Sequence, residues 1–100
     1  MGARPTPQRL IVEAATKPRM PRHIKLRHDA GRGVWLLLAH ERVFTPDPIA
    51  VEVLKLCDGE RTVADISAIL SKDFNAPEDV ILGDVVSMLQ DLADKGVVTS

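Results

Sequence analysis

Residues 33–62 read GVWLLLAHERVFTPDPIAVEVLKLCDGERT, and this stretch decides the fold. It opens with a dense apolar run of strand length, VWLLLA, and a shorter strand pattern, RVFT at residues 42–45, follows after two polar residues. Asp47 followed by Pro48 is a good helix start, because the carboxylate accepts hydrogen bonds from free first-turn amides and proline fits the first helical position. The stretch therefore predicts two strands and then a helix of about ten residues that ends near Gly59.

The segment before this stretch alternates in polarity, as a half-buried strand does. Ile24, Leu26 and His28 fall on one face of it, and the charged residues between them fall on the other. Two glycines within residues 30–33 predict a turn. Together these patterns predict a three-stranded antiparallel meander, in which Trp35 of the middle strand is a structural residue rather than a ligand contact.

Two more helices are predicted after residue 60. Thr62 is placed to cap the first of them, with Asp65 three residues later in the position that a capping box uses. Residues 75–77, Asn-Ala-Pro, begin the longest helix, and Gly96 ends it. The predicted fold is α+β and winged-helix-like, with a three-stranded antiparallel sheet followed by a three-helix bundle.

The beginning of the chain differs from the rest in composition and charge. Residues 1–21 hold four prolines and only a short apolar patch, so we expect a flexible basic leader or linker there, ahead of a folded domain over residues 22–100. Residues 1–32 carry a net charge of +6 and residues 33–100 a net charge of −7. Deleting residues 1–16 is expected to leave the folded core nearly unchanged.

Composition limits the class of protein. The chain has 100 residues, of which 45% are hydrophobic and 27% charged, as in a single soluble domain. It has no apolar run long enough for a membrane helix and no secretory signal pattern, so we expect a cytoplasmic protein. Cys57 is the only cysteine, and we expect it to be a small buried residue. We expect no metal, no cofactor and no enzymatic activity, because no ligand cluster, nucleophile motif or phosphate loop is present.

Three helices with a small sheet also suggest a helix-turn-helix regulator that binds DNA. Charge argues against this alternative. The predicted recognition helix, residues 77–95, contains five acidic residues and one lysine, a net charge of −4. DNA affinity depends largely on Lys and Arg contacts with phosphates, so this helix would repel a duplex.

The longest helix carries a wider apolar arc than core packing requires. Ile81 and Met88 fall on the shoulder of its inward face, beside Asp84, where a solvated face would be polar. They either cover the edge of the sheet or line a groove between this helix and the strand at residues 42–45. That strand has no further partner in the sequence, so its outer amides and carbonyls are free to pair with an added strand. An open edge beside an apolar shoulder favours a peptide-binding site.

Several stretches resemble the PqqD family of pyrroloquinoline quinone (PQQ) biosynthesis, and the resemblance covers residues 20–98. The stretches are IKLRHD at residues 24–29, GVWLLLAHERVF at 33–44, LCDGERTVADI at 56–66 and GDVVSMLQDLADKGVV at 83–98.

This resemblance implies a peptide chaperone that binds the ribosomal precursor PqqA by strand addition and presents it to PqqE, a radical S-adenosylmethionine enzyme. Some family members are fused to another enzyme of the pathway, which leaves open whether the leader is a tail or an interdomain linker. The resemblance also implies that the peptide lies along the third strand and the third helix. Onto this chain the site maps to Arg42, Val43, Phe44, Thr45, Ile81, Asp84, Val85 and Met88.

Overall fold

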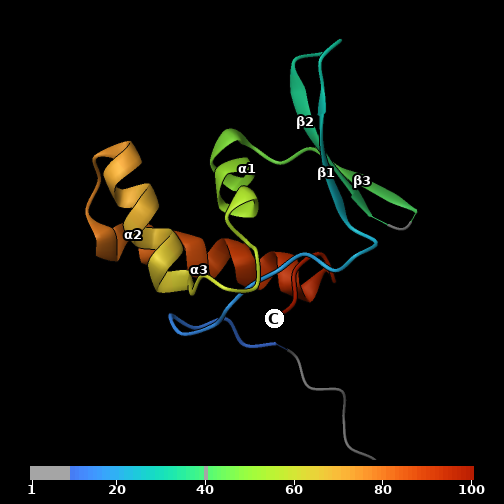
Figure 1. The fold of residues 1–100 in the computed structure, drawn as a ribbon. Helices are drawn as coiled ribbons and strands as arrows, with labels where there is room; N and C mark the ends of the chain where they lie inside the picture. The colour runs from blue at the N-terminus through green and yellow to red at the C-terminus, as the bar shows by residue number, and fades with distance from the viewer. Residues whose placement is uncertain (1–9, 40) are drawn as a thin grey trace, which may run out of the picture.

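The computed structural model describes residues 10–39 and 41–100, which form a small sheet followed by three helices (Figure 1). The three strands are antiparallel in the order β1-β2-β3, and the helices follow them in the chain. The predicted α+β, winged-helix-like arrangement is therefore confirmed. The elements are β1 (Lys25–Asp29), β2 (Val34–Ala39), β3 (Arg42–Phe44), α1 (Pro48–Lys55), α2 (Val63–Phe74) and α3 (Glu78–Asp94).

β2 is the central strand, and its two neighbours differ in length. β1 pairs with β2 along nearly all of it, whereas β3 pairs only with Leu37, Leu38 and Ala39. Because side chains alternate along a strand, Leu37 and Trp35 share one face, and Val43 lies with Leu38 on the other. Leu37 is fully buried in the core, so its face is the one that turns toward the helices.

Local capping explains where the first two helices begin. Asp47 accepts a hydrogen bond from the Ala50 amide at 2.8 Å, and Pro48 is the first residue of α1. At α2, Thr62 and Asp65 form the reciprocal capping box, with both backbone-to-side-chain bonds at 3.0 Å. Such caps satisfy amides that have no partner within the helix. Both starts agree with the sequence prediction.

The end of α1 differs slightly from the prediction. The helix has eight residues rather than about ten and ends at Lys55. Gly59, with a φ of 80°, makes its left-handed turn further along, in the loop toward α2. Gly96, with a φ of 78°, follows α3 as expected.

The core lies between the helices and the inner face of the sheet. It consists mainly of aliphatic side chains from β2, α1, α2, α3 and the C-terminal residues, which leaves a single packed cluster. Its members are Val12, Ile24, Leu37, Val53, Leu54, Cys57, Val63, Ile66, Leu70, Val85, Leu89, Val97 and Val98.

The segment expected to be a separate leader packs against the domain from residue 10 onward, so the structure differs from that expectation for residues 10–21. Val12 is 4% exposed and belongs to the core cluster, and Pro18 is fully buried. We call residues 10–21 the strap; Figure 1 shows it in blue, running alongside the helices before it enters β1. Residues 1–9 of the predicted leader lie outside the described residues.

Backbone groups hold the strap to two helices. The side-chain amide of Gln90 on α3 accepts a hydrogen bond from the Val12 amide at 2.9 Å and donates one to the Leu10 carbonyl at 2.8 Å. The first two amides of α2 donate to the carbonyls of Thr16 and Ala14, at 2.8 and 2.9 Å. These amides have no acceptor within their own helix, so the strap completes the cap of α2.

The end of the strap also pairs with the C-terminal residues. Arg19 and Thr99 exchange both of their backbone hydrogen bonds, each at 2.8 Å. The strap is therefore joined to α2, to α3 and to the end of the chain, and it belongs to the folded unit.

Candidate peptide-binding groove

The outer edge of β3 is open among the residues that the structure describes, because β3 pairs with β2 on one side only. The β2–β3 connection is two residues long and is closed by the pair Ala39 and Arg42. A two-residue hairpin is closed by a hydrogen-bonded pair, and backbone groups alternate in direction along a strand. Arg42 and Phe44 therefore point their amides and carbonyls toward β2, and Val43 points its own toward the open edge.

A groove separates β3 from α3. It has a volume of about 280 Å³ and is open to solvent. We call it the β3–α3 groove. The connection from β3 to α1 forms one wall, α3 forms the opposite wall, and the inner face of the sheet forms the floor. Its lining residues are Leu37, Phe44, Thr45, Pro46, Asp47, Ala50, Met88, Asp91 and Leu92.

A second hollow of about 210 Å³ lies among the three helices, and we call it the helical hollow. Its walls are almost entirely apolar, and the carboxylate of Asp84 lies among them. Met88 lines both the helical hollow and the β3–α3 groove, so the two are neighbours along α3. The lining residues are Ile49, Leu70, Phe74, Ile81, Asp84, Val85 and Met88.

The structure distributes the predicted site residues over these features. Phe44 and Thr45 line the groove, Ile81 and Asp84 line the helical hollow, and Met88 lines both.

The other three predicted residues do not present an exposed side chain to either hollow. Val85 is buried, so it can only form the floor of the helical hollow. Val43 is 64% exposed and turns its side chain to the outer face of the sheet, which leaves its backbone at the open edge. Arg42 lines neither hollow; its guanidinium lies over the Phe44 ring, 5.9 Å from the ring centre.

Two exposed apolar residues at the helical hollow were missed by sequence reasoning. The apolar spacing of α1 would place Ile49 on its inward stripe, but Ile49 is 52% exposed and lines the hollow. Phe74, the last residue of α2, is 45% exposed beside it. Asn75 ends α2 in a left-handed conformation, although the sequence pattern placed it at the beginning of the longest helix. A large aromatic residue next to such a helix boundary is a signal for an exposed apolar site.

Acidic residues follow the rim of both hollows. Asp47 and Asp91 line the β3–α3 groove, and Asp84 lines the helical hollow. Asp91 is paired with Lys95 at 2.9 Å, and Asp47 is occupied by its helix cap. Carboxylates therefore lie among the apolar side chains that line both hollows, and the apolar walls suit a ligand with apolar anchors.

The remaining chemistry of the described residues is sparse. Burial, and then the neighbouring Asp58 charge, raise the pKa of the Cys57 thiol to about 12, so this buried thiol is not a nucleophile at neutral pH. Residues 10–39 and 41–100 contain no cluster of three or more His, Cys, Asp or Glu side chains suited to a metal ion. Within the same residues, no helix is both long and apolar enough to cross a membrane.

An open strand edge beside an apolar groove, on a sheet followed by three helices, defines a small winged-helix-like recognition domain. Comparison with known proteins agrees with this class. The family described as coenzyme PQQ synthesis protein D (PqqD) matches residues 34–98. This chain belongs to the PqqD family.

Individual relatives agree with the family match. A PqqA binding protein of Bradyrhizobium diazoefficiens is 55% identical over 93 residues, which are 93% of this chain and 90% of the relative. The bifunctional coenzyme PQQ synthesis protein C/D of Methylorubrum extorquens is 46% identical over 80% of this chain, which corresponds to 22% of that longer protein.

A solved structure extends the agreement to the fold. It is the solution NMR structure of the PqqD truncation of Methylobacterium extorquens PqqCD, described as a functional and stand-alone RiPP (ribosomally synthesized and post-translationally modified peptide) recognition element. It matches with a TM-score of 0.78 and 42% identity, covering 89% of this chain and 95% of that one.

Proposed function

We propose that this chain is a peptide chaperone that binds the precursor peptide PqqA along the open edge of β3 and presents it to the radical S-adenosylmethionine enzyme PqqE. The observation that carries the proposal is the open β3 edge beside two apolar hollows on α3. Family membership supports the peptide as ligand, because a relative that is 55% identical is named a PqqA binding protein.

The open edge supports binding by strand addition. Val43 directs its amide and carbonyl outward, so an extended peptide can pair with it as a fourth strand. The exposed Val43 side chain lies on the outer face of the sheet and does not obstruct that pairing. The peptide's side chains would then alternate between solvent and the β3–α3 groove.

Backbone pairing alone is too weak to hold the peptide. Micromolar affinity requires about 8 kcal/mol, whereas each hydrogen bond contributes about 1 kcal/mol after desolvation. A large apolar side chain buried in a pocket contributes about 1.5–3 kcal/mol, so two or three anchors are needed to offset association entropy as well. The β3–α3 groove and the helical hollow supply sites for such anchors. Met88 lines both, so a substitution there alters both sites.

Affinities of variants for synthetic PqqA test this proposal. Met88→Asp should weaken binding at least tenfold, because it places a charge in both hollows, and it should weaken binding more than Asp84→Asn. Val80→Asp is the matched control: it adds the same charge to the same helix at a position that is 54% exposed and lines neither hollow.

Val43→Pro tests the strand addition separately, because proline removes the amide at the open edge. All variants must first show native amide dispersion by NMR. If folded Met88→Asp and Val43→Pro bind PqqA as tightly as the parent chain, the peptide does not use this edge and the proposal is wrong.

Presentation to PqqE needs its own measurement. A complex of chain and PqqA should bind PqqE, and the modification of PqqA by PqqE should depend on the chain and fall with the Met88→Asp variant. An unchanged rate without the chain would contradict the chaperone role while leaving peptide binding intact.

A further inference from the structure

A notch lies at the end of the sheet where β3 stops short. β2 has six residues, but β3 pairs with only the last three of them. If β3 continued in the register that joins Leu37 to Phe44, Pro46 would lie opposite Trp35. Strand β3 ends at Phe44, however, and a proline has no amide to donate to β2. Strand β2 therefore continues past β3 without a neighbour on that side.

Backbone direction makes this notch a place for pairing. Ala39 and Leu37 face β3, and every second residue of a strand faces the same way, so the amide and carbonyl of Trp35 also point to the side that β3 has left. A short extended segment can approach there and form the two bonds that a longer β3 would have made.

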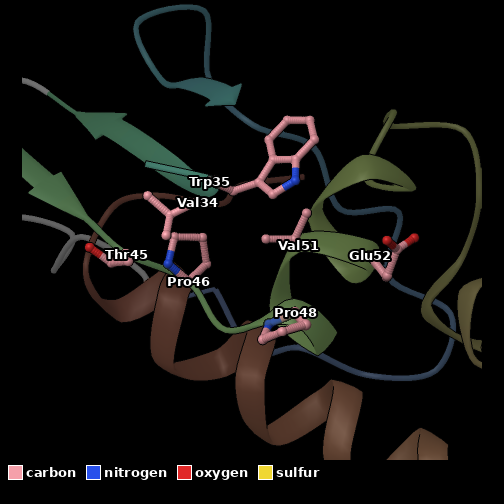
Figure 2. Close-up of a pocket in the computed structure, with 8 residues that line it drawn as sticks. Val34, Trp35, Thr45, Pro46, Pro48, Val51 and Glu52 are labelled. Atoms are coloured by element: carbon pink, nitrogen blue, oxygen red, sulfur yellow. The ribbon is translucent and has the colours of Figure 1, made fainter. Parts of the chain in front are cut away.

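The notch also contains room for a side chain. A hollow of about 220 Å³ lies between the beginning of β2 and α1. Figure 2 shows the Trp35 ring from β2 facing Val51 and Glu52 of α1, with Pro46 and Pro48 on the remaining side. Apart from Glu52 and Thr45, the labelled walls are apolar, which suits an uncharged side chain.

Two neighbouring side chains contact the Trp35 ring. The ammonium group of Lys55 lies over it, 4.6 Å from a ring centre, and the His28 ring packs at 5.0 Å between centroids. Trp35 is only partly buried, whereas its place in the middle strand predicts a structural residue without ligand contacts. An ordered, accessible aromatic wall loses little freedom when a ligand packs against it.

The occupant follows from continuity with the β3–α3 groove. Thr45 and Pro46 line both hollows, so only this short connection separates the notch from the groove. We propose that the notch is a second contact site for the same peptide, and this inference rests on the proposed function. The peptide crosses Thr45 and Pro46, pairs one residue with the backbone of Trp35, and places an apolar side chain between Trp35 and Val51. That paired residue is not proline, because its amide must donate.

Two readouts with synthetic PqqA test the inference on the full chain. In the ¹⁵N-labelled parent chain, hydrogen exchange at the Trp35 amide should slow about tenfold at peptide saturation, because the amide gains an acceptor. Calorimetry should show about tenfold weaker binding for Glu52→Trp, which fills the notch from α1. Glu60→Trp is the matched control, since Glu60 is exposed in the loop before α2 and lines none of the hollows described above.

The outcomes separate the two proposals. If PqqA perturbs the amides of Val43 and Met88 but leaves Trp35 exchange unchanged, the notch inference is overturned and the groove proposal stands. If PqqA does not bind at all, the proposed function fails and the notch inference fails with it. Should Glu52→Trp misfold, the Trp35 exchange rate in the parent chain decides the question alone.

Discussion

Removing two methyl groups from Val12 should destabilise the whole domain, although this residue lies in a stretch that looks like a disordered tail. Val12 is 4% exposed within the core cluster, and its amide is held by Gln90. The Val12→Ala change removes about 1.6 kcal/mol of transfer free energy at about 0.8 kcal/mol per carbon. The remaining cavity raises the expected loss to about 2 kcal/mol, or about 10 °C in the midpoint of thermal unfolding.

The neighbouring residue provides the matched control. Ile11 is 55% exposed, so Ile11→Ala removes more carbon but should cost less than about 0.5 kcal/mol. Urea unfolding followed by far-ultraviolet circular dichroism measures both variants. PqqA affinity should stay unchanged in Val12→Ala, because the strap contacts α3 through Gln90, and Gln90 lies about 200° around the helix from Met88. Equal free energies of unfolding for the two variants would show that the strap is not part of the folded unit.

Two further predictions concern titratable groups. Backbone amides lower the pKa of Asp58, through Arg61 and then Glu60, and the Thr62 amide lowers the pKa of Asp65. Because each folded pKa lies below the unfolded value of 3.8, the stabilisation is present above about pH 4 and is lost as the pH falls through the folded pKa. As the pH falls from about 5 to about 2, the free energy of unfolding should therefore fall less in Asp65→Asn than in the parent chain. Equal decreases in urea unfolding experiments would refute this. The Cys57 thiol, with its pKa raised to about 12, should react with a thiol reagent at about pH 8 far more slowly in the native chain than in denaturant; similar rates would mean that it is accessible.

Local signals in the sequence predicted the elements well. Asp47 with Pro48, and Thr62 with Asp65, are caps whose partners lie within three residues, so short-range chemistry is sufficient to place them. The open edge of the third strand and the apolar shoulder of the longest helix were also visible. Whether PqqA occupies the residues that the sequence predicted remains a prediction.

The strap could not be predicted in the same way. Its partner Gln90 lies 80 residues from Leu10 in the chain, and a long-range contact leaves no local pattern. Prolines disfavour helices and strands, but they are compatible with an extended strap. The strap accepts hydrogen bonds from α2 through its carbonyls, so its bonds to that helix do not require its own amides. The exposure of Ile49 could not be predicted for another reason. A helical stripe shows that a helix is amphipathic, but it does not fix which edge of the stripe is covered.

The route of the strap also determines how the domain can be attached to other objects. Leu10 itself is held beside Gln90, on the side of α3 away from Met88. In the Methylorubrum extorquens C/D protein, a related segment forms part of a longer polypeptide. A dye attached at position 10 would therefore lie on the opposite side of α3 from Met88, and it would leave the β3–α3 groove uncovered.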